Sequence, residues 1–334
     1  MVIVFSDGDE GAENILKLLT TALFHGRVML MGSQDRPEVA RVQRLGEQLG
    51  LGMLPVLAAP FRTAELQERV VDLLPHEPPP PLPVDFTEAL GNNWLELCYQ
   101  PKIDPRVLSR LGAEALIRLR HPTWGIISSA HFLPQKGDPY FRALSDFVVV
   151  KAMSDWMHFA DCAPIEIAIN LPAAVLEDPN FVERMRWQLP SHPLFRRLLV
   201  EIDSSEFAGK SRAARESMRA LSTYDVGICI DNVGAECSSL LGLEEDFPVT
   251  ELKVARTIVQ GCAEDRLKRA LCGTILDIAR RLGAATVAQG VETRADLIAV
   301  REMGFDLVQG FLFGRTMVAR KFASMLRRPV TVPP

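Results

Sequence analysis

Seven polar side chains interrupt or directly follow apolar, strand-like runs in the second part of the chain. They are Glu114, Asn170, Glu201, Asp231, Lys253, Gln289 and Gln309. Carboxylate and amide oxygens are the ligands that Mg²⁺ and Mn²⁺ prefer, so the first four side chains could hold such an ion if they converge. Lys253, set in an apolar run, would be either a base with a lowered pKa or a counter-charge. The alternative for each residue is that it only solvates the wet end of a strand.

A long alternation of predicted strands and helices must position these side chains. The strand-like runs are LELCYQPKI, GAEALIRL, IEIAINL, LLVEIDS, VGICIDN, TELKVA, ATVAQGV and LVQGFLF, and helical patterns lie between most of them. About eight strands with interposed helices are typical of a TIM-like (β/α)8 barrel. Such barrels carry their functional side chains at the carboxyl ends of the strands, which is where the polar residues are expected.

The proline-rich stretch PHEPPPPLPVD, residues 75–85, divides the chain. Its prolines favour an extended, stiff linker over packed structure. Before it, VIVF, RVMLM and MLPVLAAPF alternate with amphipathic helical patterns, which predicts a small, open, parallel α/β sheet. We therefore predict a domain over residues 1–74, a linker over 75–85 and a barrel over 86–328.

The composition is that of a globular protein. The chain has 334 residues, 48% of them hydrophobic, and a formal net charge of -5, which argues against a generic nucleic-acid binder. No stretch approaches the roughly 20 apolar residues of a membrane helix, and the N-terminus lacks a charged leader. Six scattered cysteines without C-x-x-C spacing favour reduced thiols over structural zinc. We expect a cytoplasmic protein with no membrane and no nucleic-acid partner.

Eight motifs in series resemble the EAL domain, the family of cyclic di-GMP phosphodiesterases, over roughly residues 86–325. They are YQPKID, GAEALIRLRHP, AINLPAAVLEDPNFV, VEIDSSEF, DNVGAECSSL, ELKVAR, VAQGVET and DLVQGFLFGR. Active members are similar to a TIM barrel in which two divalent ions activate a water against one phosphodiester, giving linear pGpG.

The resemblance also implies roles for individual residues. The implied ligands of Mg²⁺ or Mn²⁺ are Glu114, Asn170, Glu201 and Asp231. Lys253 would position or activate the water in an active member, and it would be vestigial here. The implied nucleotide-binding residues are Gln100, Pro101, Glu114, Arg118, Asp231, Glu292 and Gln309.

The chain departs from the family pattern around the metal site. Where the family has DDFGTG this chain has DNVGAE, so Asn232 replaces the second aspartate. Gln289 stands for the glutamate of EGVE, Ala255 for the aspartate of the lysine motif, and Ser204 for a glutamate that braces the catalytic loop. A neutral amide attracts a hard dication much less than a carboxylate does. We therefore expect an incomplete metal site and a large loss of hydrolytic rate.

These departures predict a non-hydrolysing signalling protein that binds cyclic di-GMP, a protein partner, or both, and needs no cofactor for binding. One alternative is a slow metal-dependent phosphodiesterase that produces pGpG, which the intact Glu114, Glu201 and Lys253 would support. Another is a protein-interaction scaffold that does not use the nucleotide.

Residues 1–74 resemble the second half of a receiver domain. VIVFSD, VMLMGS and LAAPF correspond to its phosphoacceptor strand, its switch strand and the strand that ends in Lys-Pro-Phe. Asp7 falls at the phosphoacceptor, but Ala59 replaces the lysine and the strand with the acidic Mg²⁺ pair is missing, so phosphorylation is not expected. The sheet edge that remains favours a homodimer or a protein partner, through residues 1–74 or the barrel.

Overall fold

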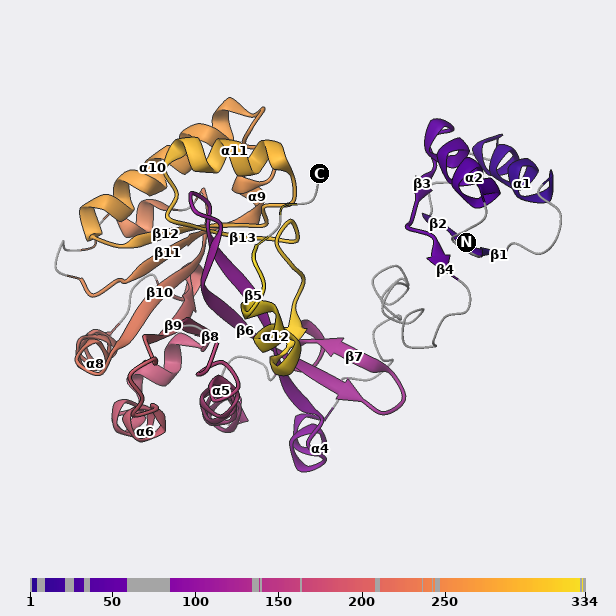
Figure 1. The fold of residues 1–334 in the computed structure, drawn as a ribbon. Helices are drawn as coiled ribbons and strands as arrows, with labels where there is room; N and C mark the ends of the chain where they lie inside the picture. The colour runs from indigo at the N-terminus through magenta and orange to yellow at the C-terminus, as the bar shows by residue number, and fades with distance from the viewer. Residues whose placement is uncertain are drawn as a thin grey trace. The chain divides into compact units, whose positions relative to one another are not determined.

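We describe a computed structural model of the chain. It describes residues 2–4, 10–21, 27–32, 37–58, 85–133, 138, 140–162, 164–207, 211–235, 237–241, 243, 247–330 and 332. The chain divides into two compact units, Met1–Leu82 and Pro83–Pro334, which we describe separately (Figure 1).

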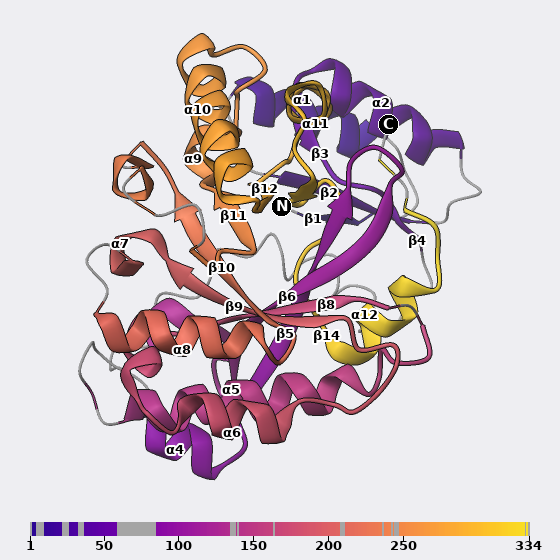
Figure 2. The same ribbon diagram turned by 90° about the vertical axis from the view of Figure 1, so that its left-hand side faces the viewer.

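The larger unit is a closed barrel of eight strands, which confirms the predicted TIM-like fold. In barrel order the strands are β5 (Leu95–Asp104), β6 (Ser109–His121), β8 (Glu166–Asn170), β9 (Arg197–Asp203), β10 (Val226–Val233), β11 (Glu251–Val254), β12 (Ala285–Gln289) and β13 (Leu307–Gln309). The strands from β6 to β13 pair in parallel, whereas β5 is antiparallel to both of its neighbours. The turn between β5 and β6 is too short for a crossover helix, so these two strands must form a hairpin. Figure 2 shows β5 and β6 side by side as a long hairpin.

Helices cover the outside of the barrel wall, as Figures 1 and 2 show. The α-helices of this unit are α4 (Phe86–Gly91), α5 (Tyr140–Trp156), α6 (Phe181–Gln188), α7 (Ser204–Phe207), α8 (Arg212–Ser222), α9 (Arg256–Val259), α10 (Arg266–Leu282), α11 (Arg294–Met303) and α12 (Ala319–Leu326). The described residues of this unit also form three 3₁₀ turns, η1 (Ser129–His131), η2 (Ala173–Glu177) and η3 (Cys237–Leu240), and two short strands, β7 (Gly125–Ser128) and β14 (Met317–Val318). None of the helices in the described ranges is long and apolar enough to cross a membrane.

Alternation along the strands separates an apolar core from a polar barrel interior. On β11, Leu252 and Val254 belong to the hydrophobic core between wall and helices, while Glu251 and Lys253 are buried inside the barrel. Successive side chains of a strand point to opposite faces, so residues two apart share a face. Glu251 and Lys253, two residues apart on β11, therefore both point into the barrel interior.

The described residues of the smaller unit form a parallel sheet and two helices. The described elements are β1 (Val2–Val4), α1 (Glu10–Thr21), β2 (Arg27–Gly32), α2 (Pro37–Gln48), β3 (Gly52–Met53) and β4 (Leu57–Ala58). β2 pairs with β1, and β3 and β4 pair with successive parts of β2. The receiver resemblance and the domain bounds at 74 and 85 stay predictions. The residues outside the described ranges include Asp7, Ala59 and all of the linker except Asp85. They also include residues 63–74, whose amphipathic pattern predicts a helix.

Candidate functional site

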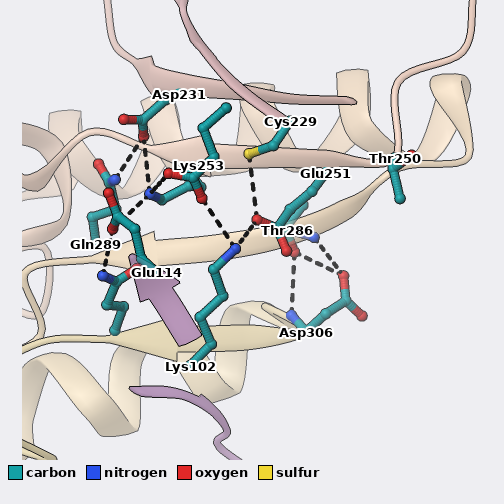
Figure 3. Close-up of polar contacts among 12 residues, drawn as sticks. Lys102, Glu114, Cys229, Asp231, Thr250, Glu251, Lys253, Thr286, Gln289 and Asp306 are labelled. Atoms are coloured by element: carbon teal, nitrogen blue, oxygen red, sulfur yellow. Dashed lines mark hydrogen bonds and ion pairs between the residues drawn. The ribbon is translucent and has the colours of Figure 1, made fainter. Parts of the chain in front are cut away.

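Lys253 lies at the centre of a cluster of carboxylates inside the barrel (Figure 3). Its side chain is fully buried, and its Nζ lies 2.7 Å from Glu201 Oε2 and 2.9 Å from Glu114 Oε2. Asp231 Oδ1 is 3.4 Å from the same nitrogen. The structure thus brings three of the four predicted metal ligands, from β6, β9 and β10, around the predicted lysine.

Amide groups occupy most of the remaining acceptor positions of these carboxylates. Asn170 Nδ2 donates to Glu114 Oε1 at 2.8 Å, and Gln309 Nε2 donates to Glu114 Oε2 at 2.6 Å. Gln309 Nε2 also lies 2.9 Å from Gln100 Oε1, so Gln100 joins the same network. On the opposite side, Gln289 Nε2 donates to Asp231 Oδ1 at 2.7 Å. Donors from the chain itself thus satisfy Glu114 and Asp231 Oδ1, whereas Glu201 Oε1 is buried without a hydrogen-bond partner among the described residues.

The network also separates the pKa values of its members. Burial alone would raise the pKa of Glu114, but the Lys253 ammonium and the amide donors outweigh it and lower this pKa to about 2. Burial and the neighbouring charge of Glu114 raise the pKa of Glu201 to about 8. Burial would lower the pKa of Lys253, yet Asp231 and the two glutamates raise it well above its ordinary value. These directions favour Lys253 as a counter-charge over Lys253 as a base.

Asn232 follows Asp231 at an irregularity in the pairing of β10 with β11. Its φ is +58°, a left-handed conformation that asparagine tolerates better than most residues. Its side chain is exposed and its Nδ2 lies 3.4 Å from Asp203 Oδ2, outside the Lys253 cluster. Ser204 Oγ donates to the Asn232 carbonyl oxygen at 3.0 Å and so fixes this turn. Asn232, which stands at the position of the family's second aspartate, therefore adds no charge to the cluster and directs no oxygen atom toward it.

The donor set fits one divalent ion better than two. Oxygens of Glu114, Glu201 and Asp231 lie within 4.8 Å of one another, a spacing suited to a single oxygen-preferring cation. A second ion would need further carboxylates, but Gln289 presents an NH₂ donor to Asp231 and Asn232 points to Asp203. An amide offers a dication only a neutral carbonyl oxygen, which attracts it much less than a carboxylate does, so the residues present do not fit a two-metal centre.

The predicted nucleotide-binding residues fall into two groups. Gln100 lies directly opposite Glu114 in the β5–β6 pairing, Pro101 follows it, and Gln309 bridges the two strands. Arg118 lies four residues beyond Glu114 on β6, on the same face, and donates to the Ile117 carbonyl at 2.8 Å. Glu292 is 3.9 Å from the Arg256 guanidinium. Within the described ranges, neither Arg118 nor Glu292 shares a hydrogen bond or ion pair with the Lys253 network.

Two buried charged residues were missed in the sequence. Lys102 and Glu251 form an ion pair inside the barrel, with Nζ 2.5 Å from Glu251 Oε1. The signal was present, because Lys102 lies two residues after Gln100 and Glu251 two residues before Lys253. That spacing places each on the inward face of its strand.

Comparison with known proteins supports the family resemblance. The EAL domain family matches residues 84–316. The bifunctional diguanylate cyclase/cyclic di-GMP phosphodiesterase MucR of Pseudomonas aeruginosa is 33% identical over 241 residues, which are 71% of this chain and 35% of MucR. Cyclic di-GMP phosphodiesterase PA2567 of the same organism is 28% identical over 247 residues, 73% of this chain and 42% of PA2567. The chain thus spans well under half the length of these two relatives.

Solved structures agree in fold. A structure of the PaMucR phosphodiesterase in a c-di-GMP complex matches with a TM-score of 0.65 and 32% identity, covering 71% of this chain and 98% of that one. The FimX EAL domain from Pseudomonas aeruginosa bound to c-di-GMP has a TM-score of 0.58 at 19% identity, over 69% of this chain and 94% of that one. With a family match over most of its length and the barrel site described above, the chain belongs to the EAL domain family.

Proposed function

We propose that the barrel binds cyclic di-GMP and does not hydrolyse it at an appreciable rate. The observation that carries this proposal is the hydrogen bond from Gln289 to Asp231. At this position the chain presents a neutral donor to a carboxylate that would otherwise face a metal ion. Together with the outward turn of Asn232, it leaves the cluster without the charge that a second dication requires.

The three carboxylates that remain would support only slow metal-dependent hydrolysis. Glu114, Glu201 and Asp231 would hold one Mg²⁺ or Mn²⁺, and an ion bound there would supply positive charge that lowers the pKa of a nearby water. Lys253 already neutralises part of the negative charge of these carboxylates, since its ammonium contacts all three of them. The ion therefore competes with a built-in cation, and the rate of hydrolysis should be low.

Nucleotide binding does not depend on the missing acids. Arg118 carries a planar guanidinium that matches phosphate geometry, and it lies on the same strand and face as Glu114. Gln100 and Gln309 present amide groups beside Glu114, on β5 and β13, which suit hydrogen bonds to a polar ligand. The resemblance to PaMucR, which was solved in a c-di-GMP complex, supports nucleotide binding by this barrel.

A slow metal-dependent phosphodiesterase is the second candidate. The close approach of Glu114, Glu201 and Asp231 favours it, because three convergent carboxylates are more than nucleotide binding needs. This candidate requires one ion to suffice for water activation, at a rate far below that of a two-metal site.

Calorimetric titration of the full chain with cyclic di-GMP separates these candidates. The titrations are made in EDTA, in Mg²⁺ and in Mn²⁺, and the same samples are then analysed for pGpG. Our proposal expects binding in all three buffers without product. Metal-dependent pGpG at a rate comparable to an intact family member would refute it, and the absence of both binding and product would favour a protein-interaction scaffold.

A further inference from the structure

A second buried lysine reaches the carboxylate cluster from within the barrel. Lys102 is 1% exposed, and its Nζ contacts Glu251 Oε1 at 2.5 Å and Glu201 Oε1 at 3.2 Å (Figure 3). Glu251 Oε1 also accepts from Cys229 Sγ at 3.3 Å. Lys102 therefore joins a deeper layer of the barrel to the site described above.

Glu201 lies between the two lysines. One of its oxygens, Oε1, faces Lys102, and the other, Oε2, lies 2.7 Å from Lys253. Its side chain is fully buried, so no water competes for either oxygen at the surface. Oε2 already lies near the oxygens of Glu114 and Asp231, but turning Oε1 toward the same ion would break the Lys102 contact, which is costly for a buried ammonium.

The contribution of Lys102 to the site can be tested without changing the net charge of the barrel interior. Lys102 and Glu251 carry opposite charges, so removing both leaves the net charge around Glu114, Glu201, Asp231 and Lys253 unchanged. Their joint removal would free Glu201 Oε1 without adding negative charge. The effect of making Glu201 Oε1 available to a metal ion can thus be measured apart from the effect of the total charge of the cluster.

We propose that Lys102, held in place by Glu251, acts as a positioning residue that withholds the inner oxygen of Glu201 from a divalent ion. The ammonium of Lys102 attracts the inner oxygen of Glu201 across 3.2 Å, as an ion pair without a hydrogen bond, and so favours the orientation in which this oxygen faces the barrel interior. This inference deepens the proposed function, on which it rests, because it supplies a second reason why the site works without a bound ion.

The test is the affinity of the full chain for Mn²⁺ alone, measured by electron paramagnetic resonance and calorimetry. The variant is Lys102→Met/Glu251→Met, and Lys102→Gln/Glu251→Gln keeps polar groups in the barrel if the first does not fold. The loss of Glu251 also removes the alternative cluster of Glu201, Cys229 and Glu251, so any gain belongs to the outer carboxylates. We expect Mn²⁺ to bind about tenfold or more tightly than in the unmodified chain, because one more carboxylate oxygen is available.

The matched control is Arg212→Met/Glu216→Met, which removes an exposed ion pair with a 2.7 Å contact on α8. It should leave Mn²⁺ affinity unchanged. An unchanged Mn²⁺ affinity in the folded Lys102/Glu251 variants, or an equal gain in the control, would overturn the inference. Cyclic di-GMP titrated into the unmodified chain in EDTA tests the proposed function separately, since a failure to bind there says nothing against the Mn²⁺ comparison.

Discussion

Gln289→Glu should convert a stabilising hydrogen bond into a repulsion that a metal ion relieves. In the structure, Gln289 Nε2 donates to Asp231 Oδ1 at 2.7 Å. A glutamate at this position would place two carboxylates side by side. Two like charges about 4 Å apart repel by about 4 kcal/mol at an effective dielectric constant near 20. Asp231 is partly exposed, so movement and hydration should reduce the observed loss in unfolding free energy to about 1 to 2 kcal/mol.

The assay is unfolding of the full chain with increasing Mn²⁺. A bound ion neutralises the new repulsion, so Mn²⁺ should stabilise the Gln289→Glu variant more than the unmodified chain. An ion present at about 100 times its Kd stabilises by about 2.7 kcal/mol, which would restore or exceed the lost stability.

The control is Asp231→Asn/Gln289→Glu, which exchanges the two groups and keeps the charge of the unmodified chain. It should show no comparable gain from Mn²⁺, because the number of carboxylates is unchanged. Equal stabilisation of the single variant and the unmodified chain by Mn²⁺ would refute the reasoning that charge at position 289 limits the metal site.

Three further predictions concern the nucleotide, the core and the N-terminal unit. Arg118→Ala should weaken cyclic di-GMP binding by about 1.5 to 3 kcal/mol in calorimetry, the range for a charged hydrogen bond, with little effect on folding. Glu114→Gln should leave binding in EDTA nearly intact, so an equal loss from both changes would instead indicate a metal-bridged ligand. Tyr99→Phe should lower the unfolding free energy by about 1 to 3 kcal/mol, because the Tyr99 hydroxyl donates to a buried carboxylate at 3.0 Å; an unchanged denaturation midpoint would contradict this. Deletion of residues 1–84 should lower the oligomeric state in light scattering, whereas Asp7→Asn should not; an Asp7→Asn variant that behaved like the deletion would point to a phosphoacceptor.

Most of the barrel could be predicted from the sequence because its strands are local patterns. An apolar run interrupted by one charged residue, as at Lys253, indicates a buried strand with one side chain facing a polar interior. The eight runs from β5 to β13 are predicted as apolar, strand-like segments with helical patterns between most of them, and the structure contains a strand at each. β5 is antiparallel to β6 because the turn between them is short. The number of predicted strands does not indicate this reversal.

The site was predictable in its residue types but not in its contacts. The resemblance to the EAL family implies that a carboxylate is replaced at Asn232 and Gln289, because the replacement of a charged residue by an amide is visible in the aligned motifs without coordinates. Only the tertiary structure decided that Gln289 turns its donor toward Asp231 and that Asn232 turns to Asp203. Only barrel closure could bring Lys102 of β5 against Glu251 of β11, since strand stagger sets which inward residues meet and no local pattern encodes it.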